Sequence, residues 1–173
     1  NPMTDNFERI ACDLPNGGTN LLNSNFINCI LTDGEHIWFG TEGRGAVRYT
    51  PSSGDLTAYT TRDGLPNDVV YKVIEDKNKN LWISTNKGLA CYEPLSGNLK
   101  VYTSGNGLTS DQFNYKSGFR DLNGKLYFGT INGAVHNEFQ SRSCRNDRFE
   151  VERPVFRDLR PAISAECLHA VYG

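Results

Sequence analysis

The 173-residue sequence has little excess charge of either sign, because 18 lysine and arginine residues nearly balance 20 aspartate and glutamate residues, for a net charge of −2. Proteins that bind nucleic acid through its phosphates normally carry a basic patch, so we expect no nucleic-acid partner. Long apolar runs are also absent, and no stretch approaches the roughly 20 apolar residues of a membrane helix. We therefore expect contact with a membrane only through parts outside this sequence.

Metal-binding and catalytic motifs are missing as well. The five cysteines form no Cys-x-x-Cys pair and lie near no histidine cluster, so we expect no metal site. Buried or incidental thiols are the favoured interpretation of these cysteines, and a stray disulfide is the alternative. The chain contains no G-x-S-x-G motif, no H-E-x-x-H motif and no phosphate-binding glycine loop. We therefore expect no catalytic residue, no enzyme activity and no cofactor.

Glycine and aromatic residues are abundant instead, and they recur at a fixed period. The chain has 17 glycines, 8 tyrosines, 9 phenylalanines and 2 tryptophans, which is typical of tight turns around aromatic strands. Leu22, Leu65 and Leu108 follow one another at intervals of 43 residues, and the last two directly follow Gly64 and Gly107. Each of these glycines suits a turn that needs a positive φ. This periodicity predicts a tandem repeat.

Each repeat contains an aromatic strand that follows a polar turn. The three copies of the strand are Ile-Trp-Phe-Gly-Thr at 37–41, Leu-Trp-Ile-Ser-Thr at 81–85 and Leu-Tyr-Phe-Gly-Thr at 126–130. The turns carry Asp33, Asp76 and Asp121, which we interpret as residues that bond their own backbone rather than as paired acids. Apolar residues flank Trp38 and Trp82, so we place both in the core between blades rather than in a sugar-stacking platform.

The other apolar stretches of the repeat complete a unit of four short strands. Apolar residues alternate before the aromatic strand, and two further strands follow it across glycine-containing turns. Such a small antiparallel meander cannot bury its faces alone, whereas about four to eight of them pack radially in a β-propeller. A helical solenoid would need a 3.6-residue apolar stripe, which these repeats lack. We therefore predict an all-β fold of β-propeller blades, in a partial propeller of about three blades.

The repeat divides the chain into five parts. Residues 1–21 would supply the last strand of a preceding blade and a connection, residues 22–64 and 65–107 one blade repeat each, and residues 108–140 an incomplete repeat. Residues 141–173 form a non-repeat tail, because they contain six arginines and a single glycine. We expect this tail to be disordered or artefactual, with a linker or the start of a following domain as the alternative.

The repeated pattern resembles the two-component regulator propeller repeat. The resemblance covers residues 1 to about 139. It is carried by a Gly-Leu turn, an apolar pair, an aspartate, and the string Leu-Trp-Ile-Ser-Thr-Asn-Lys-Gly-Leu at 81–89 followed by Tyr92 and Pro94. Residues 107–130 are similar to the closing repeats in hybrid two-component sensors of Bacteroides-type gut bacteria.

This resemblance implies a sensor domain on the periplasmic or extracellular side of a bacterial inner-membrane protein. It also implies a small extracellular ligand, often an oligosaccharide from glycan breakdown, and a histidine kinase elsewhere in the parent protein. The remaining propeller blades of the parent chain are expected partners, and a homodimer with a second copy is a further candidate. One alternative is a scaffold for protein partners, marked by an exposed apolar patch. The other is an enzyme similar to streptogramin lyases, marked by a histidine–acid pair on the channel face; no such pair is visible in the sequence.

The geometry of a four-stranded antiparallel meander predicts where a ligand would bind. The loop that enters the first strand and the loop between the second and third strands lie at the same end of the sheet. A mixed polar rim around the mouth of a channel suits a small polar molecule, and solvated loop tips are the alternative for each residue. The candidate binding residues on these loops are Glu42, Arg44, Arg62, Asn67, Asp68, Asn86, Lys87, Asp111, Gln112 and Asn132.

Overall fold

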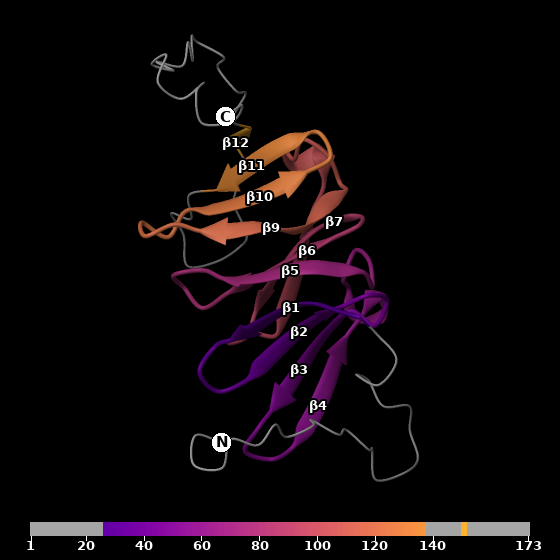
Figure 1. The fold of residues 1–173 in the computed structure, drawn as a ribbon, viewed down its shortest axis with the longest axis vertical. Coiled ribbons are helices and arrows are strands. Elements are labelled where there is room, and N and C mark those ends of the chain that lie inside the picture. Colours follow the sequence, from indigo (N-terminus) through magenta and orange to yellow (C-terminus); the bar gives the residue numbers. More distant parts are fainter. Residues whose placement is uncertain (1–25, 138–149, 152–173) are drawn as a thin grey trace, which may run out of the picture.

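The chain forms three antiparallel sheets of four strands each (Figure 1). The computed structural model describes residues 26–137 and 150–151. The first sheet consists of β1 (Ile27–Thr32), β2 (Ile37–Thr41), β3 (Ala46–Thr50) and β4 (Asp55–Tyr59). The second consists of β5 (Val70–Glu75), β6 (Leu81–Thr85), β7 (Gly88–Glu93) and β8 (Asn98–Tyr102). The third consists of β9 (Phe113–Arg120), β10 (Leu126–Thr130), β11 (Gly133–Asn137) and β12 (Glu150–Val151). The predicted all-β fold of four-stranded meanders is confirmed.

The first strands of the three sheets lie next to one another. β5 of the middle sheet contacts both β1 and β9, and Figure 1 shows the three strands one above another. The fourth strands β4, β8 and β12 lie at the other edges of their sheets. This is the arrangement of propeller blades, whose first strands surround a common axis. The prediction of a partial propeller with three blades is therefore confirmed.

Two apolar clusters hold neighbouring sheets together. One cluster joins Trp38 of the first sheet to Val73 and Ile83 of the second, and the other joins Trp82 of the second sheet to Phe128 of the third. Trp38 is 1% exposed and Trp82 is fully buried. Burial of one large apolar side chain contributes roughly 1.5–3 kcal/mol to stability. The two tryptophans therefore belong to the core between blades, as predicted, and not to a sugar-stacking platform.

The aspartate that precedes each aromatic strand organises its turn. Oδ1 of Asp76 accepts hydrogen bonds from the backbone N–H groups of Asn78 at 2.7 Å and Asn80 at 2.9 Å. Asp33 and Asp121 accept equivalent bonds from the backbone of the turns that follow them. The interpretation of these carboxylates as turn residues is confirmed.

A short 3-10 turn begins the connection from each of the first two sheets to the next. η1 (Thr61–Asp63) ends at Gly64, whose φ is 103°, and η2 (Ser104–Asn106) ends at Gly107, whose φ is 98°. The positive φ predicted for these glycines is confirmed, although the 3-10 turns themselves were not predicted. The leucine that follows each glycine is buried, so it anchors the connection in the core.

Several predictions concern residues outside the described part of the chain. The prediction of a strand within residues 1–21 and most of the prediction for the tail at 141–173 fall outside the described residues. Two residues of this tail, Glu150–Val151, pair with β11 as the fourth strand of the third sheet. No helix among the described residues is long and apolar enough to span a membrane.

The two described cysteines differ in their chemistry. Cys29 is a buried free cysteine, whereas Cys91 is disulfide-bonded. The interpretation of the cysteines as thiols is therefore correct for Cys29 and wrong for Cys91. The error has a simple cause, because spacing along the chain does not reveal which cysteines the fold brings within bonding distance.

Candidate functional site

The ten predicted binding residues lie on loops at one end of the sheets. They occupy five connections: Glu42 and Arg44 between β2 and β3, Arg62, Asn67 and Asp68 between β4 and β5, Asn86 and Lys87 between β6 and β7, Asp111 and Gln112 before β9, and Asn132 between β10 and β11. Four of the ten are exposed, namely Arg62, Lys87, Gln112 and Asn132, and the other six are half-buried. We call these ten residues the polar rim.

Backbone hydrogen bonds bring part of the polar rim together. Two N–H groups of the β2–β3 loop donate to the carbonyl of Asp68 at 3.0 and 2.8 Å, which holds this loop against the segment that enters β5. The N–H of Ile131 donates to the carbonyl of Gln112 at 3.1 Å, which holds the β10–β11 turn against the segment that enters β9. Arg62 and Lys87 are exposed outside these two groups. The structure thus joins two parts of the rim through backbone hydrogen bonds.

Two carboxylates of the polar rim have structural roles. Oδ1 of Asp68 accepts the backbone N–H of Thr61 at 2.6 Å, and Oδ1 of Asp111 accepts the backbone N–H of Ser104 at 2.5 Å. Each aspartate therefore fixes the first residue of η1 or η2 at an equivalent place in the repeat. Both carboxylates therefore help to form the connections between the sheets.

A second group of residues, not predicted from the sequence, surrounds Glu42 at the inner strands. Oε2 of Glu42 accepts a hydrogen bond from Nδ2 of Asn28 at 2.8 Å, and Oε1 accepts one from the hydroxyl of Tyr115 at 2.9 Å. The ring of Tyr115 contacts the ring of Tyr71, with 4.3 Å between the centroids. We call Asn28, Glu42, Tyr71 and Tyr115 the axial cluster. It joins all three sheets, because the asparagine and the two tyrosines belong to β1, β5 and β9.

The axial cluster combines a buried and an exposed tyrosine. Tyr71 is 5% exposed, whereas Tyr115 is 53% exposed. The hydrogen bond to Glu42 is the main cause that raises the pKa of Tyr115 to about 12. Burial, together with the negative charge of Glu42, raises the pKa of Tyr71. Both phenols are therefore neutral near pH 7, and Tyr115 offers solvent an apolar ring beside a fixed carboxylate.

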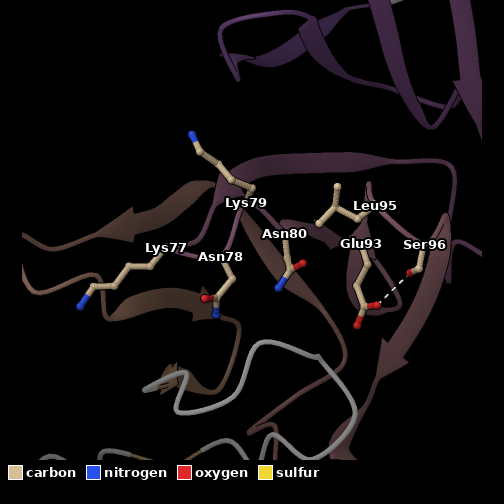
Figure 2. Close-up of a pocket in the computed structure, with 7 residues that line it drawn as sticks. All are labelled: Lys77, Asn78, Lys79, Asn80, Glu93, Leu95 and Ser96. Carbon is tan, nitrogen blue, oxygen red and sulfur yellow. Dashed lines mark hydrogen bonds between the residues drawn. The ribbon is translucent and has the colours of Figure 1, made fainter.

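A hollow of about 320 Å³ opens at the opposite end of the middle sheet (Figure 2). Its lining residues are Lys77, Asn78, Lys79, Asn80, Glu93, Leu95 and Ser96. Figure 2 shows the two lysine side chains extending in different directions from the β5–β6 turn. Nζ of Lys79 pairs with Glu75 at 2.8 Å, and the carboxylate of Glu93 accepts the hydroxyl of Ser96 at 2.9 Å. Polar groups of the lining thus bind near neighbours instead of converging on a common point.

A histidine–acid pair is present in the β1–β2 turn. Nδ1 of His36 lies 3.3 Å from Oδ2 of Asp33, and the same oxygen accepts the indole N–H of Trp38 at 2.9 Å. A turn brings these two side chains together, which the sequence alone did not reveal. However, the β1–β2 turn lies at the end of the sheet away from the polar rim, so the pair does not meet the condition set for an enzyme. The described residues contain no group of three or more histidine, cysteine or acidic side chains that could hold a metal.

Comparison with known families identifies two of the repeats. Residues 21–43 and 64–87 match the family described as Two component regulator propeller. Each match begins one residue before a leucine of the 43-residue period, and the matches include the first two aromatic strands. The resemblance inferred from the sequence is confirmed. A comparison with curated proteins gives no match.

Solved structures share the fold. The chain is 33% identical to the extracellular domain of BT3049 from B. thetaiotaomicron, described as a hybrid two component system, over 64% of this chain and 15% of that one, with a TM-score of 0.60. It is 24% identical to the extracellular domain of BT4673 from the same organism, over 81% of this chain and 18% of that one, with a TM-score of 0.60. A catalytically inactive virginiamycin B lyase from Staphylococcus aureus is 17% identical over 70% of this chain and 39% of its own, with a TM-score of 0.51. The last two likenesses show the fold alone, and the chain spans a small part of the BT3049 and BT4673 domains.

Proposed function

We propose that this chain is a ligand-sensing segment of a β-propeller in a bacterial two-component sensor receptor. The proposal is carried by three radially packed four-stranded blades together with 33% identity to the extracellular domain of BT3049. The segment then lies on the periplasmic or extracellular side of the membrane. The disulfide bond of Cys91 fits this placement, because disulfides persist in oxidising compartments.

The proposed ligand is a small extracellular carbohydrate, bound without being transformed. The polar rim places polar side chains of all three blades at one end of the sheets, where a small polar molecule could contact more than one blade. A ligand that binds one arrangement of the parent receptor more tightly than another shifts the population toward that arrangement. The signal would then pass to a histidine kinase in another part of the parent protein.

Further blades of the parent chain are the proposed partners of the two outer sheets. Ile30 of β1 and Val73 of β5 pair with the same position of the aromatic strand, yet Ile30 is 63% exposed and Val73 only 2%. Likewise, Phe119 of β9 is 65% exposed, whereas Ile74 at the equivalent position of β5 is 6% exposed. The outer sheets thus expose apolar side chains where the middle sheet buries them against a neighbouring blade. This pattern favours additional blades over a surface for unrelated protein partners.

Thermal denaturation of the full-length protein that contains these repeats tests the sensor proposal. A ligand that binds only the folded state raises the melting temperature, by an amount set by its concentration relative to Kd. Against a panel of oligosaccharides from plant and host glycans, we expect a rise with one glycan class. The rise should be lost in Arg44→Ala or Lys87→Ala and kept in Leu95→Ala, which changes a residue at the opposite end.

Other outcomes of the same screen would contradict the proposal. No shift with any oligosaccharide would remove the support for carbohydrate sensing. Appearance of a cleaved product would favour a lyase-like enzyme, as expected for a propeller that resembles virginiamycin B lyase in fold.

A further inference from the structure

The third repeat is longer than the first two before its turn aspartate. Asp33 comes 11 residues after Leu22 in the first repeat, and Asp76 comes 11 residues after Leu65 in the second. In the third repeat Asp121 comes 13 residues after Leu108. Two residues have therefore been added between the Gly-Leu turn and the turn aspartate, within the segment that contains β9.

Strand pairing shows where the two additional residues lie. In β1 and β5, a single residue, Asn28 or Tyr71, interrupts the register with the aromatic strand. In β9 the interruption covers residues 114–117, which stand opposite Gly129 alone. The bulge of one residue in the first two blades is thus enlarged in the third. Bulges of this kind occur next to active sites, where they redirect side chains.

The enlarged bulge combines an unusual backbone conformation with a close contact to the neighbouring strand. Lys116 has a φ of 58°, in the left-handed region that residues other than glycine rarely adopt. A Cβ atom at Gly129 would lie 2.8 Å from the Cβ atom of Ser117, so a larger residue there would force the bulge or β10 to shift. Such departures from regular geometry concentrate at functional sites, where the surrounding structure maintains them.

The same bulge brings Tyr115 into the axial cluster. The Tyr115 hydroxyl reaches from the third sheet to Glu42 of the first sheet at 2.9 Å, and its ring contacts Tyr71 of the second. The neighbouring Asn114 is also exposed, and its Nδ2 is fixed by a bond to the carbonyl of Thr130 at 2.9 Å. The bulge therefore holds an aromatic ring against a carboxylate, and the preceding residue carries an exposed amide.

We infer that the enlarged bulge of β9 forms the subsite that holds one sugar ring of the ligand. The apolar face of the sugar packs on the exposed ring of Tyr115, and its hydroxyls bond the carboxylate of Glu42 and the amide oxygen of Asn114. Bonds from Asn28 and Tyr115 fix the orientation of Glu42 before the ligand arrives, which lowers the entropic cost of binding. This inference rests on the proposed carbohydrate-sensing function and deepens it.

Deletion of Tyr115 and Lys116 from the full-length protein tests the subsite directly. The deletion restores the eleven-position interval of the first two repeats, which form blades with a bulge of one residue. We therefore expect the variant to keep a melting temperature close to that of the wild type. In calorimetric titrations with each oligosaccharide of the plant and host glycan panel, binding should weaken at least tenfold. Tyr115→Ala should weaken binding to a similar extent, and Tyr115→Phe should weaken it less, because the phenylalanine keeps the ring.

Each outcome of these titrations decides between the two proposals. If no oligosaccharide binds the wild type, both the sensor proposal and the subsite are overturned. If the wild type binds and the deletion and Tyr115→Ala bind within twofold of it, the subsite is overturned while the sensor proposal stands. If the deletion does not fold, Tyr115→Ala decides in the same way. A loss of binding in Leu95→Ala alone would place the ligand in the hollow at the opposite end and overturn the subsite.

Discussion

The indole Nε1 of Trp82 donates a hydrogen bond of 3.0 Å to Oδ2 of Asp76, and Trp38 makes the equivalent bond of 2.9 Å to Asp33. Each aspartate also organises the turn before the aromatic strand. The tryptophan that fills the core between two blades is thus hydrogen-bonded to the turn that positions its own strand. Packing and turn geometry therefore support each other in these two blades.

We expect Asp76→Ala to lower the free energy of unfolding by about 3 kcal/mol. Asp76 is 1% exposed, and its carboxylate accepts the indole N–H of Trp82 and two backbone N–H groups. Without it, these donors lose a buried charged acceptor, and an unsatisfied buried donor costs about 1–3 kcal/mol. Urea unfolding of the full-length protein measures the change.

The third blade supplies the matched control for this variant. Asp121 accepts the backbone N–H of Lys125 at 2.8 Å, but Tyr127 stands where the other blades have tryptophan. We expect Asp121→Ala to cost about 1 kcal/mol, because it removes a bond at a half-buried turn. Equal losses in the two variants would mean that the bond to the indole contributes nothing.

Asp33 makes the stability of the first blade sensitive to acid. Burial alone would raise the pKa of this carboxyl, but hydrogen bonds from the backbone of His36, the indole of Trp38 and the backbone of Glu35 outweigh it and lower the pKa below its usual 3.8. Because the folded-state pKa lies below the unfolded value, the contribution to stability is complete above about pH 5 and is lost as the pH falls through the folded value. Asp33→Asn should therefore show a flatter dependence of its urea midpoint on pH between about pH 5 and pH 2. Parallel curves for the wild type and the variant would contradict this role.

Repetition explains why the sequence predicted the blades. The leucines, the aromatic strands and the turn aspartates recur at nearly fixed intervals, and a residue type preserved in three copies reports a shared structural position. The burial of Trp38 and Trp82 and the positive φ of Gly64 and Gly107 follow from that periodicity. Each of these residues performs a role that its counterpart performs in another blade.

The axial cluster was not predicted because it does not repeat. Asn28, Tyr71 and Tyr115 come from different repeats and meet only after the three sheets have packed. The longer interval in the third repeat was a visible signal, but the register of β9 was needed to locate the additional residues. Glu42 was predicted from loop geometry, whereas its two partners at the inner strands were not.

The hydrogen bond between Tyr115 and Glu42 predicts that Tyr115 loses its proton at a higher pH than an ordinary tyrosine. This bond holds the pKa of Tyr115 at about 12, so Glu42→Gln should lower that pKa toward the ordinary value of 10.0. Because the folded-state pKa is raised, the stabilising contribution is complete below about pH 10 and is lost as the pH rises through 12. Ultraviolet absorbance titration measures the change, with Tyr115→Phe identifying which part of the signal belongs to this residue. An unchanged titration in Glu42→Gln would show that the carboxylate does not control the phenol.

Gly129 and Ser117 face each other across the enlarged bulge. Their contact predicts that a substitution at Gly129 lowers stability and that a second substitution at Ser117 restores it. A Cβ atom at residue 129 would lie 2.8 Å from both Cβ and Oγ of Ser117, so Gly129→Ala should cost about 1–3 kcal/mol in urea unfolding. Ser117→Gly removes both opposing atoms, and the double variant should therefore recover most of that loss, with a coupling energy on the order of 1 kcal/mol. Gly105→Ala is the control, because its nearest neighbour, Oγ1 of Thr103, lies at 3.6 Å and permits a methyl group. A double variant as unstable as Gly129→Ala would mean that Ser117 is not the source of the crowding.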